Sequence, residues 1–83
     1  MKVAFLFFAR SREIAGTQSW EIDLHDGASI QDALQAVLTQ FPALTEFEGR
    51  CVLALNQEYI DKDSKQHLKD GDEVALIPPI SGG

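Results

Sequence analysis

One segment of this sequence, residues 29–42, has the pattern of an amphipathic helix, and it constrains the fold more than any other feature does. Ser29 lies where a helix N-cap belongs, Asp32 falls in the first turn, and Pro42 ends the helix. The apolar side chains recur at helical spacing on one face: Ile30, Ala33, Leu34, Val37, Leu38 and Phe41. A helix of about three turns is long enough to cover one face of a small sheet.

The other apolar segments have the pattern of strands. Val3–Ala9 is apolar at both odd and even positions, which is typical of a central strand covered on both faces. Residues 20–24 alternate between apolar and acidic side chains, as a strand with one wet face requires. Apolar runs at residues 51–55 and 73–77 predict two more strands, and residues 59–60 can return as a short edge strand.

The order of these elements predicts an α+β fold. Residues 10–17, between the first two strands, are expected to form an irregular loop with one helical turn at residues 12–15. We expect a mixed sheet of four to five strands, with one main helix packed on one face and the first and last strands parallel and central. This is the ubiquitin-like β-grasp arrangement. The predicted domain covers residues 1–79, and residues 80–83 form a flexible C-terminal tail.

Size and charge narrow the classes of function. The chain has 83 residues, which is enough for one domain and too few for a core together with a walled catalytic cleft. Its net charge of −6 disfavours nucleic acid and anionic membranes as partners and suits a basic face on another protein. No apolar run approaches the roughly 18 residues of a membrane span. A single cysteine rules out an internal disulfide and is typical of a cytoplasmic protein.

Side chains that could perform chemistry are few. His25 and His67 have no cysteine, histidine or carboxylate at metal-ligand spacing, so no bound metal is expected. Cys51 opens an apolar strand and is interpreted as an inert core residue. The acidic cluster at residues 70–73 has the pattern of a solvated turn. We expect no catalysis by side chains of this chain.

The aromatic residues Phe5, Phe7, Phe8 and Trp20 lie at strand spacing, and their simplest interpretation is packing in the core. In so small a domain one apolar face of the sheet can remain partly exposed. Such an apolar patch would be a surface on which a partner docks.

The C-terminal residues have a different character. After Pro78 and Pro79, the sequence Ile80-Ser81-Gly82-Gly83 has no charge and nothing to pack against. Two glycines without Cβ atoms suit a tail that passes through a narrow channel and presents its carboxylate. That group has an ordinary pKa of about 3.3–3.7 and is a poor electrophile at neutral pH, so it must be activated before acyl transfer. Transfer to AMP would create a leaving group, which a sulfur nucleophile could displace.

Five segments resemble the family of small, sulfur-carrier subunits of molybdopterin synthase, which is related to the thiamine-pathway sulfur carriers and to ubiquitin-like modifiers. These segments are Leu6–Ala9, Arg12–Gly16, Leu55–Gln57, Asp70–Ala75 and Pro78–Gly83. The similarity spans nearly the whole chain. The final Gly-Gly pair is shared with the related families, whereas the Phe-Phe-Ala and Arg-Glu-x-x-Gly stretch near the start is more specific.

The resemblance implies a chemical role for Gly83. An E1-like adenylyltransferase that uses ATP would adenylate it, and a sulfur-donor protein would convert it to a thiocarboxylate. Ser81 and Gly82 would thread the tail into the active site of the large subunit, where the sulfur enters a pterin precursor of the molybdenum cofactor. The chain would therefore be a sulfur-donating subunit without catalytic side chains or a bound cofactor of its own.

The resemblance also implies how this chain assembles. Two small subunits would flank a dimer of large subunits in a heterotetramer. Phe8, Tyr59 and Ile77 would be the hydrophobic docking residues, although the family more often has an aliphatic residue at the position of Tyr59. Two alternatives remain open: a sulfur carrier of the thiamine pathway, and a protein modifier that ends in an isopeptide bond to a lysine.

Overall fold

The structure is a computed structural model, and it describes residues 1–47, 50–61 and 64–78. Its elements follow in the order β1 (Lys2–Phe7), α1 (Ala9–Ala15), β2 (Ser19–Asp23), α2 (Ile30–Gln40), the 3-10 helix η1 (Pro42–Phe47), β3 (Val52–Leu55), β4 (Glu58–Ile60) and β5 (Glu73–Ile77). The tail predicted at residues 80–83 lies outside the described residues.

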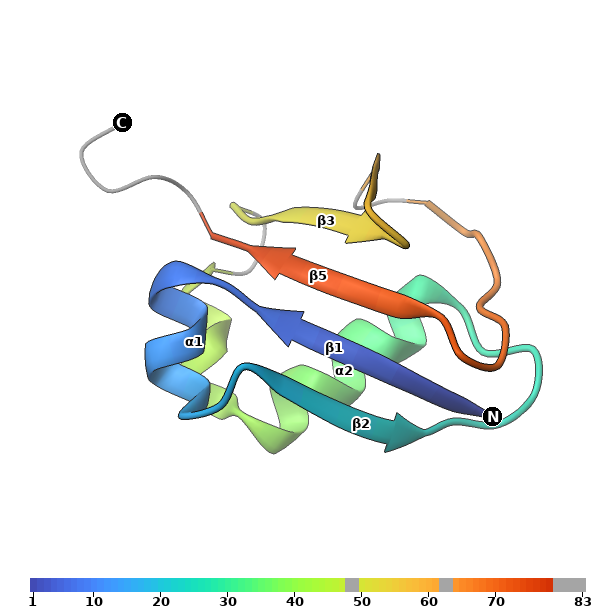
Figure 1. Cartoon of the computed structure of the whole chain (residues 1–83), viewed down its shortest axis with the longest axis horizontal. Helices are drawn as coiled ribbons and strands as arrows, with labels where there is room; N and C mark the ends of the chain where they lie inside the picture. Colours follow the sequence, from blue (N-terminus) through green and yellow to red (C-terminus); the bar gives the residue numbers. More distant parts are fainter. Residues whose placement is uncertain (48–49, 62–63, 79–83) are drawn as a thin grey trace.

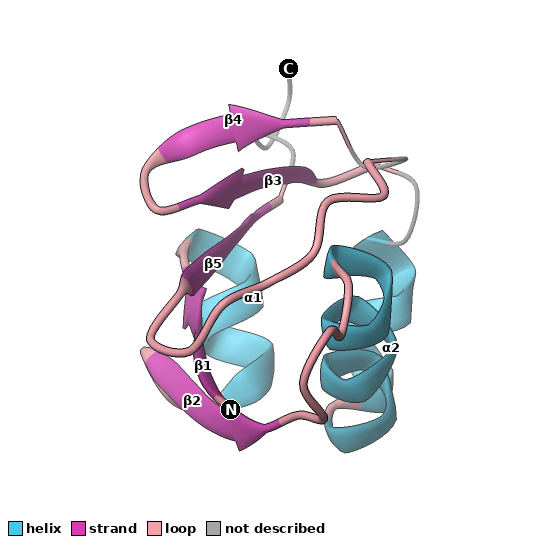
Figure 2. Cartoon of the chain, turned by 90° about the vertical axis from the view of Figure 1, so that its right-hand side faces the viewer, coloured by secondary structure: helices cyan, strands magenta, loops and turns pink. Residues whose placement is uncertain are grey.

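The five strands form one mixed sheet with the order β2-β1-β5-β3-β4. Figure 1 shows β2, β1, β5 and β3 side by side, and β4 is labelled next to β3 in Figure 2. β1 runs parallel to β5, and the other neighbouring pairs are antiparallel. The first and last strands of the chain therefore lie side by side inside the sheet, as the sequence predicts. Figure 2 shows both α-helices on one side of the sheet. Within the described part of the chain, no helix lies on the opposite side.

The main helix, α2, is held by the predicted N-cap. The Ser29 hydroxyl accepts a hydrogen bond from the Asp32 amide at 3.2 Å, and the Asp32 carboxylate accepts one from the Ser29 amide at 3.0 Å. This reciprocal capping box satisfies two amides that have no partner inside the helix. The helix ends at Gln40, before Pro42, and Pro42 opens η1, which the sequence pattern did not reveal.

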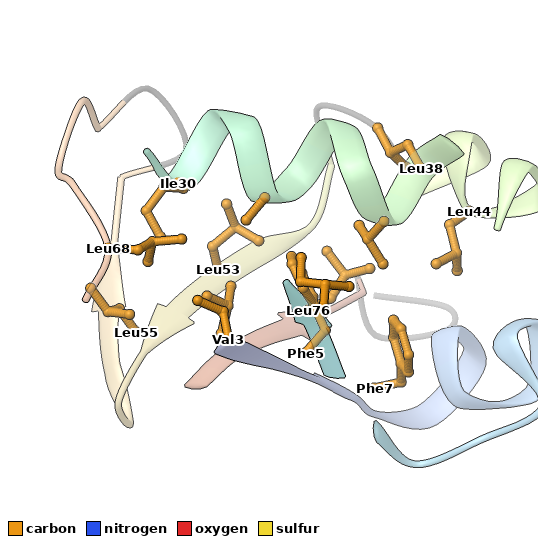
Figure 3. Packing of buried hydrophobic residues seen from close by; sticks show 14 residues of the cluster. Val3, Phe5, Phe7, Ile30, Leu38, Leu44, Leu53, Leu55, Leu68 and Leu76 are labelled. Atoms are coloured by element: carbon orange, nitrogen blue, oxygen red, sulfur yellow. The ribbon is translucent and has the colours of Figure 1, made fainter. Parts of the chain in front are cut away.

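The core lies between α2 and the sheet (Figure 3). Ile30 and Val37 of α2 meet Phe5 of β1 and Leu76 of β5, and all four side chains are buried. The prediction that β1 is covered on both faces is wrong. Its other face, which includes Leu6, is only half-buried, because the helices cover one side of the sheet.

The first helix differs from the predicted loop with a single turn at residues 12–15. α1 spans Ala9–Ala15, and β1 ends at Phe7 rather than at Ala9. The chain changes direction at Ala9, whose φ of 51° is unusual for an L-residue. Gly16 ends the helix with a φ of 75°, a left-handed conformation that glycine adopts readily.

Candidate functional site

The candidate site is the side of the sheet that faces away from α2. Residues paired across neighbouring strands place their side chains on the same face. The register pairs Leu6 with Ala75, Ala75 with Ala54, and Ala54 with Tyr59, so a row of apolar residues crosses four strands. We call this surface the outer face and define it by Leu6, Phe8, Val52, Ala54, Tyr59, Ala75 and Ile77.

The outer face concentrates the exposed hydrophobic surface of the domain. Phe8, Val52 and Tyr59 are 47%, 46% and 79% exposed, and within residues 1–47, 50–61 and 64–78 they are all of the exposed large hydrophobic residues. Exposed apolar residues scattered singly are ordinary on a protein surface, but a contiguous group marks an interaction site. The structure therefore has one apolar face that a partner could cover.

A hollow of about 330 Å³ lies in the outer face. The three docking residues that the sequence resemblance indicated, Phe8, Tyr59 and Ile77, all line it. Ala54 and Ala75 line it too, and because their side chains are small they leave space between the larger neighbours. The structure thus brings the three residues together, and their role in docking stays a prediction.

One edge of the hollow is polar, and hydrogen bonds hold the turn beside it. Gln57 and Glu73 line it there. The Asn56 side chain donates a hydrogen bond to Asp72 Oδ1 at 3.0 Å and accepts one from the Glu73 amide at 3.0 Å. These bonds tie the β3–β4 turn to the start of β5. The hollow therefore joins an apolar floor to an acidic rim, which suits a partner with an apolar side chain beside a basic one.

The acidic cluster at residues 70–73 is a hydrogen-bonded turn, as the sequence predicts. Asp70 Oδ1 accepts a bond from the Lys2 amide at 2.7 Å, and Asp72 Oδ2 accepts one from the Lys69 amide at 2.7 Å. Gly71, with a φ of 88°, supplies the left-handed conformation that this turn requires. These carboxylates hold the loop that precedes β5.

The remaining candidates for chemistry are dispersed. His25 Nε2 lies 3.9 Å from Asp32 Oδ2, and Cys51 is half-buried against the core. The pKa of Asp32 lies below its ordinary value, chiefly because its carboxylate accepts the hydrogen bond from the Ser29 amide. In the described part of the chain, no group of three or more histidine, cysteine or acidic side chains is placed to hold a metal. Nor does that part contain a helix long and apolar enough to cross a membrane.

Ile77 connects the outer face to the predicted tail. It ends β5, lines the hollow and is followed by Pro78, which is buried and is the last described residue. Gly83, the predicted reactive residue, and the threading residues Ser81 and Gly82 lie outside the described residues. In sequence, the five residues 79–83 follow Pro78, and Gly83 is the last of them.

Val52 belongs to the outer face, and sequence reasoning missed it. In the structure Leu53 and Leu55 of β3 are buried in the core, and the alternation of side chains along a strand places Val52 on the other face. Its register partner Ile77 confirms this placement. Without the register, a short apolar strand gives no indication of which side chains are free.

A five-stranded mixed sheet, helices on one side and a free apolar face define the class as ubiquitin-like β-grasp proteins. The structure matches SAMP1 from Haloferax volcanii with a TM-score of 0.88 and 30% identity over the full length of both chains. It also matches a chain of the complex of subunits 1 and 2 of the molybdopterin-converting factor from Helicobacter pylori, with a TM-score of 0.72, 32% identity and full coverage of both chains.

The model of the ThiS family matches residues 5–83. A molybdopterin synthase sulfur carrier subunit from Chlamydomonas reinhardtii is 49% identical over 83 residues, with 100% of both chains covered. The chain belongs to the ThiS family. The resemblance found in the sequence is confirmed at this level.

Proposed function

We propose that this chain is the sulfur-carrier subunit of molybdopterin synthase and that it carries sulfur on Gly83 as a thiocarboxylate. The observation that carries the proposal is the position of Ile77. This residue lines the hollow of the outer face and is also the last residue of the strand that leads to the Gly-Gly terminus. A docking surface and a reactive terminus are thus continuous in the chain, as a carrier requires. The Chlamydomonas reinhardtii relative bears the same functional name.

The partner that covers the outer face is, in this proposal, the large subunit of the synthase. The similar Helicobacter pylori structure is a protein–protein complex of subunits 1 and 2 of the molybdopterin-converting factor. Phe8, Tyr59 and Ile77 would anchor the domain. Five extended residues reach at most about 18 Å, so an anchored outer face confines the terminal carboxylate to a short radius around Pro78. Confinement of this kind raises the effective concentration of the reacting group.

The chemistry occurs at the terminal carboxyl group of Gly83. In an E1-like adenylyltransferase, a carboxylate oxygen attacks the α-phosphate of ATP, pyrophosphate leaves, and an acyl-adenylate forms. Sulfide supplied by a donor protein then attacks the carbonyl carbon, so that a C–S bond forms, the C–O bond to AMP breaks, and AMP leaves. The sulfur of the resulting thiocarboxylate attacks a carbon of the pterin precursor and displaces an oxygen leaving group there, which gives a thioester. Hydrolysis of the acyl C–S bond leaves the sulfur on the pterin and returns the carboxylate for another cycle.

The large subunit supplies the catalytic side chains in this scheme. The small chain contributes the docking surface, the tail and the activated sulfur, and ATP is bound by the adenylyltransferase. Two small and two large subunits form the proposed heterotetramer, and the proposed location is the cytoplasm. The net charge of −6 and the acidic rim at Glu73 favour a basic surface on each of these partners.

A protein modifier is the second candidate, and the structural match to SAMP1 favours it, because a related Haloferax volcanii structure is named small archaeal modifier protein 1. In that case the activated Gly83 would form an isopeptide bond to a lysine. A carrier for the thiamine pathway has the same tail chemistry with a different acceptor, and the family model that matches this chain includes ThiS in its name. The products distinguish the three functions.

The test uses the full chain, ATP and a lysate of its own organism, analysed by intact mass and by gel. A molybdopterin carrier should gain the mass of one sulfur in place of one oxygen, and it should restore molybdopterin synthesis when mixed with the synthase large subunit. A ladder of heavier conjugates would instead support a modifier. A variant without Gly83 is the matched control, and it should give none of these products.

A further inference from the structure

Ser11 is the one polar residue that is fully buried among the residues that the structure describes. Its hydroxyl is completely shielded from solvent and lies in the first turn of α1. The Phe8 amide donates to Ser11 Oγ at 3.0 Å, and the hydroxyl has two carbonyl acceptors, Phe8 O at 2.7 Å and Leu76 O at 3.3 Å. A buried polar group with its partners in place fixes the segments that it connects.

The connected segments are the ends of the two central strands. The parallel pairing of β1 with β5 has Phe7 opposite Leu76 as its last pair. One residue further along each strand stand Phe8 and Ile77, both of which line the hollow. Ser11 Oγ lies within hydrogen-bond distance of the Phe8 amide and the Leu76 carbonyl, so its hydroxyl links the residue that follows β1 to the last paired residue of β5.

Phe8 needs such a link because its own packing is weak. Its side chain is 47% exposed, and the next residue, Ala9, has a φ of 51°, a conformation that an L-residue adopts only when its surroundings hold it. The bonds of Ser11 to both the amide and the carbonyl of Phe8 hold the backbone on one side of this turn. Without the hydroxyl, the Phe8 carbonyl keeps its bond from the Ser11 amide at 3.1 Å, but the Phe8 amide loses its bond to Ser11 Oγ.

We propose that Ser11 is a positioning residue for sulfur transfer. Its buried hydroxyl fixes Phe8 relative to the end of β5, and it thereby sets the relative placement of Phe8 and Ile77, two of the residues that line the hollow on which the partner docks. The inference rests on the proposed function, since it assigns to Ser11 an effect on partner docking. A merely structural hydroxyl would change stability without a specific change at the outer face.

The first test needs no partner. Backbone amide spectra and relaxation dispersion by NMR are recorded for the wild type, Ser11→Ala and Ser11→Cys, with Val37→Ala as the control. Val37 is also fully buried, but it lies on α2 in the core, away from the outer face. Exchange broadening at Phe8 and Ile77 is expected in Ser11→Ala and not in Val37→Ala. If Ser11→Ala and Val37→Ala changed the amide spectra equally and uniformly along the chain, the inference would be overturned.

Ser11→Cys makes the test independent of whether Ser11→Ala folds. A thiol occupies the position of the hydroxyl with a larger atom, and it is a weaker hydrogen-bond donor and acceptor. Broadening at Phe8 and Ile77 beyond that of the wild type, in a chain that melts cooperatively, supports the proposal. If the Phe8 and Ile77 amides of Ser11→Cys gave the same spectra as those of the wild type, the proposal would be refuted.

The second test measures binding to the purified molybdopterin synthase large subunit of the same organism. Ser11→Ala should raise Kd about tenfold, which corresponds to about 1.4 kcal/mol, while Val37→Ala leaves Kd within twofold of the wild type. If the wild type binds and both variants bind equally well, Ser11 has no positioning role. If the wild type does not bind at all, the proposed function fails, and the NMR comparison alone decides on Ser11.

Discussion

Tyr59→Ala separates docking from folding more cleanly than any other change on the outer face. Tyr59 is 79% exposed, so its removal takes little buried surface from the free domain, and the melting temperature should change little. A fully buried tyrosine covers roughly 200 Å², and about 150 Å² of it is free here to be buried by a partner. At about 25 cal/mol per Å², this area is worth up to about 4 kcal/mol on binding.

Burial of Tyr59 at an interface is incomplete, which reduces that upper value. Tyr59→Ala is therefore expected to weaken binding by about 2 kcal/mol, which raises Kd roughly thirtyfold. Isothermal titration calorimetry against the synthase large subunit measures Kd, and thermal unfolding by circular dichroism measures stability. Gln35→Ala is the control, because Gln35 is exposed on α2, on the opposite side of the sheet. Equal Kd values for Tyr59→Ala and Gln35→Ala would refute the assignment of the outer face as the docking surface.

Three further predictions concern the turn, the helix cap and the isolated chain. Gln57 has a φ of 73° in a two-residue hairpin turn, so Gln57→Gly should raise the melting temperature by about 4 °C, whereas Asn56→Gly should lower it by removing the bonds to Asp72 and Glu73. Asp32→Asn should lower the melting temperature at neutral pH. The folded-state pKa of Asp32 is depressed, so its charged carboxylate stabilises the fold above the ordinary pKa of 3.8. The difference in melting temperature between the wild type and Asp32→Asn should therefore disappear as the pH falls below that value. The pure chain should hydrolyse no ATP in a phosphate-release assay, and turnover above a buffer blank would contradict the division of labour proposed here.

Two elements of the fold could be predicted closely from the sequence. α2 has a complete apolar face, an N-cap at Ser29 and a proline stop, so local signals agree on its bounds. β5 was predicted at residues 73–77 and is found there, because a turn signal at Gly71 and the prolines that follow Ile77 mark its ends. Where local sequence signals and tertiary packing favour the same element, the sequence pattern is sufficient to predict the bounds of that element.

α1 could not be predicted in the same way. Its seven residues have no continuous apolar stripe, and its start depends on Ser11, whose bond to the Leu76 carbonyl joins positions 65 residues apart in sequence. A helix this short is not stable by itself in water. Ser11 is an ordinary helix residue in the sequence, and only its buried surroundings reveal why β1 ends at Phe7.

The candidate site was predicted in part. The resemblance supplied Phe8, Tyr59 and Ile77, but nothing in the sequence pattern placed them in one hollow. Their convergence depends on the strand order and on the register that pairs Ala54 with both Tyr59 and Ala75. Val52 went unrecognised for the same reason, since a strand of four apolar residues does not disclose which of its faces is covered.

The central claim is that Gly83 is the reactive residue and that the folded domain delivers it. The decisive measurement is the intact mass of the wild type and of the chain without Gly83, each incubated with the adenylyltransferase, ATP and a sulfur donor. Loss of one terminal residue shifts the carbonyl by roughly 3.5 Å, about the full distance across which the attacking atom must approach. The account predicts that the wild type exchanges one oxygen for sulfur and that the shortened chain melts at the same temperature but remains unmodified. A shortened chain that still gained sulfur and still supported pterin sulfuration would contradict it.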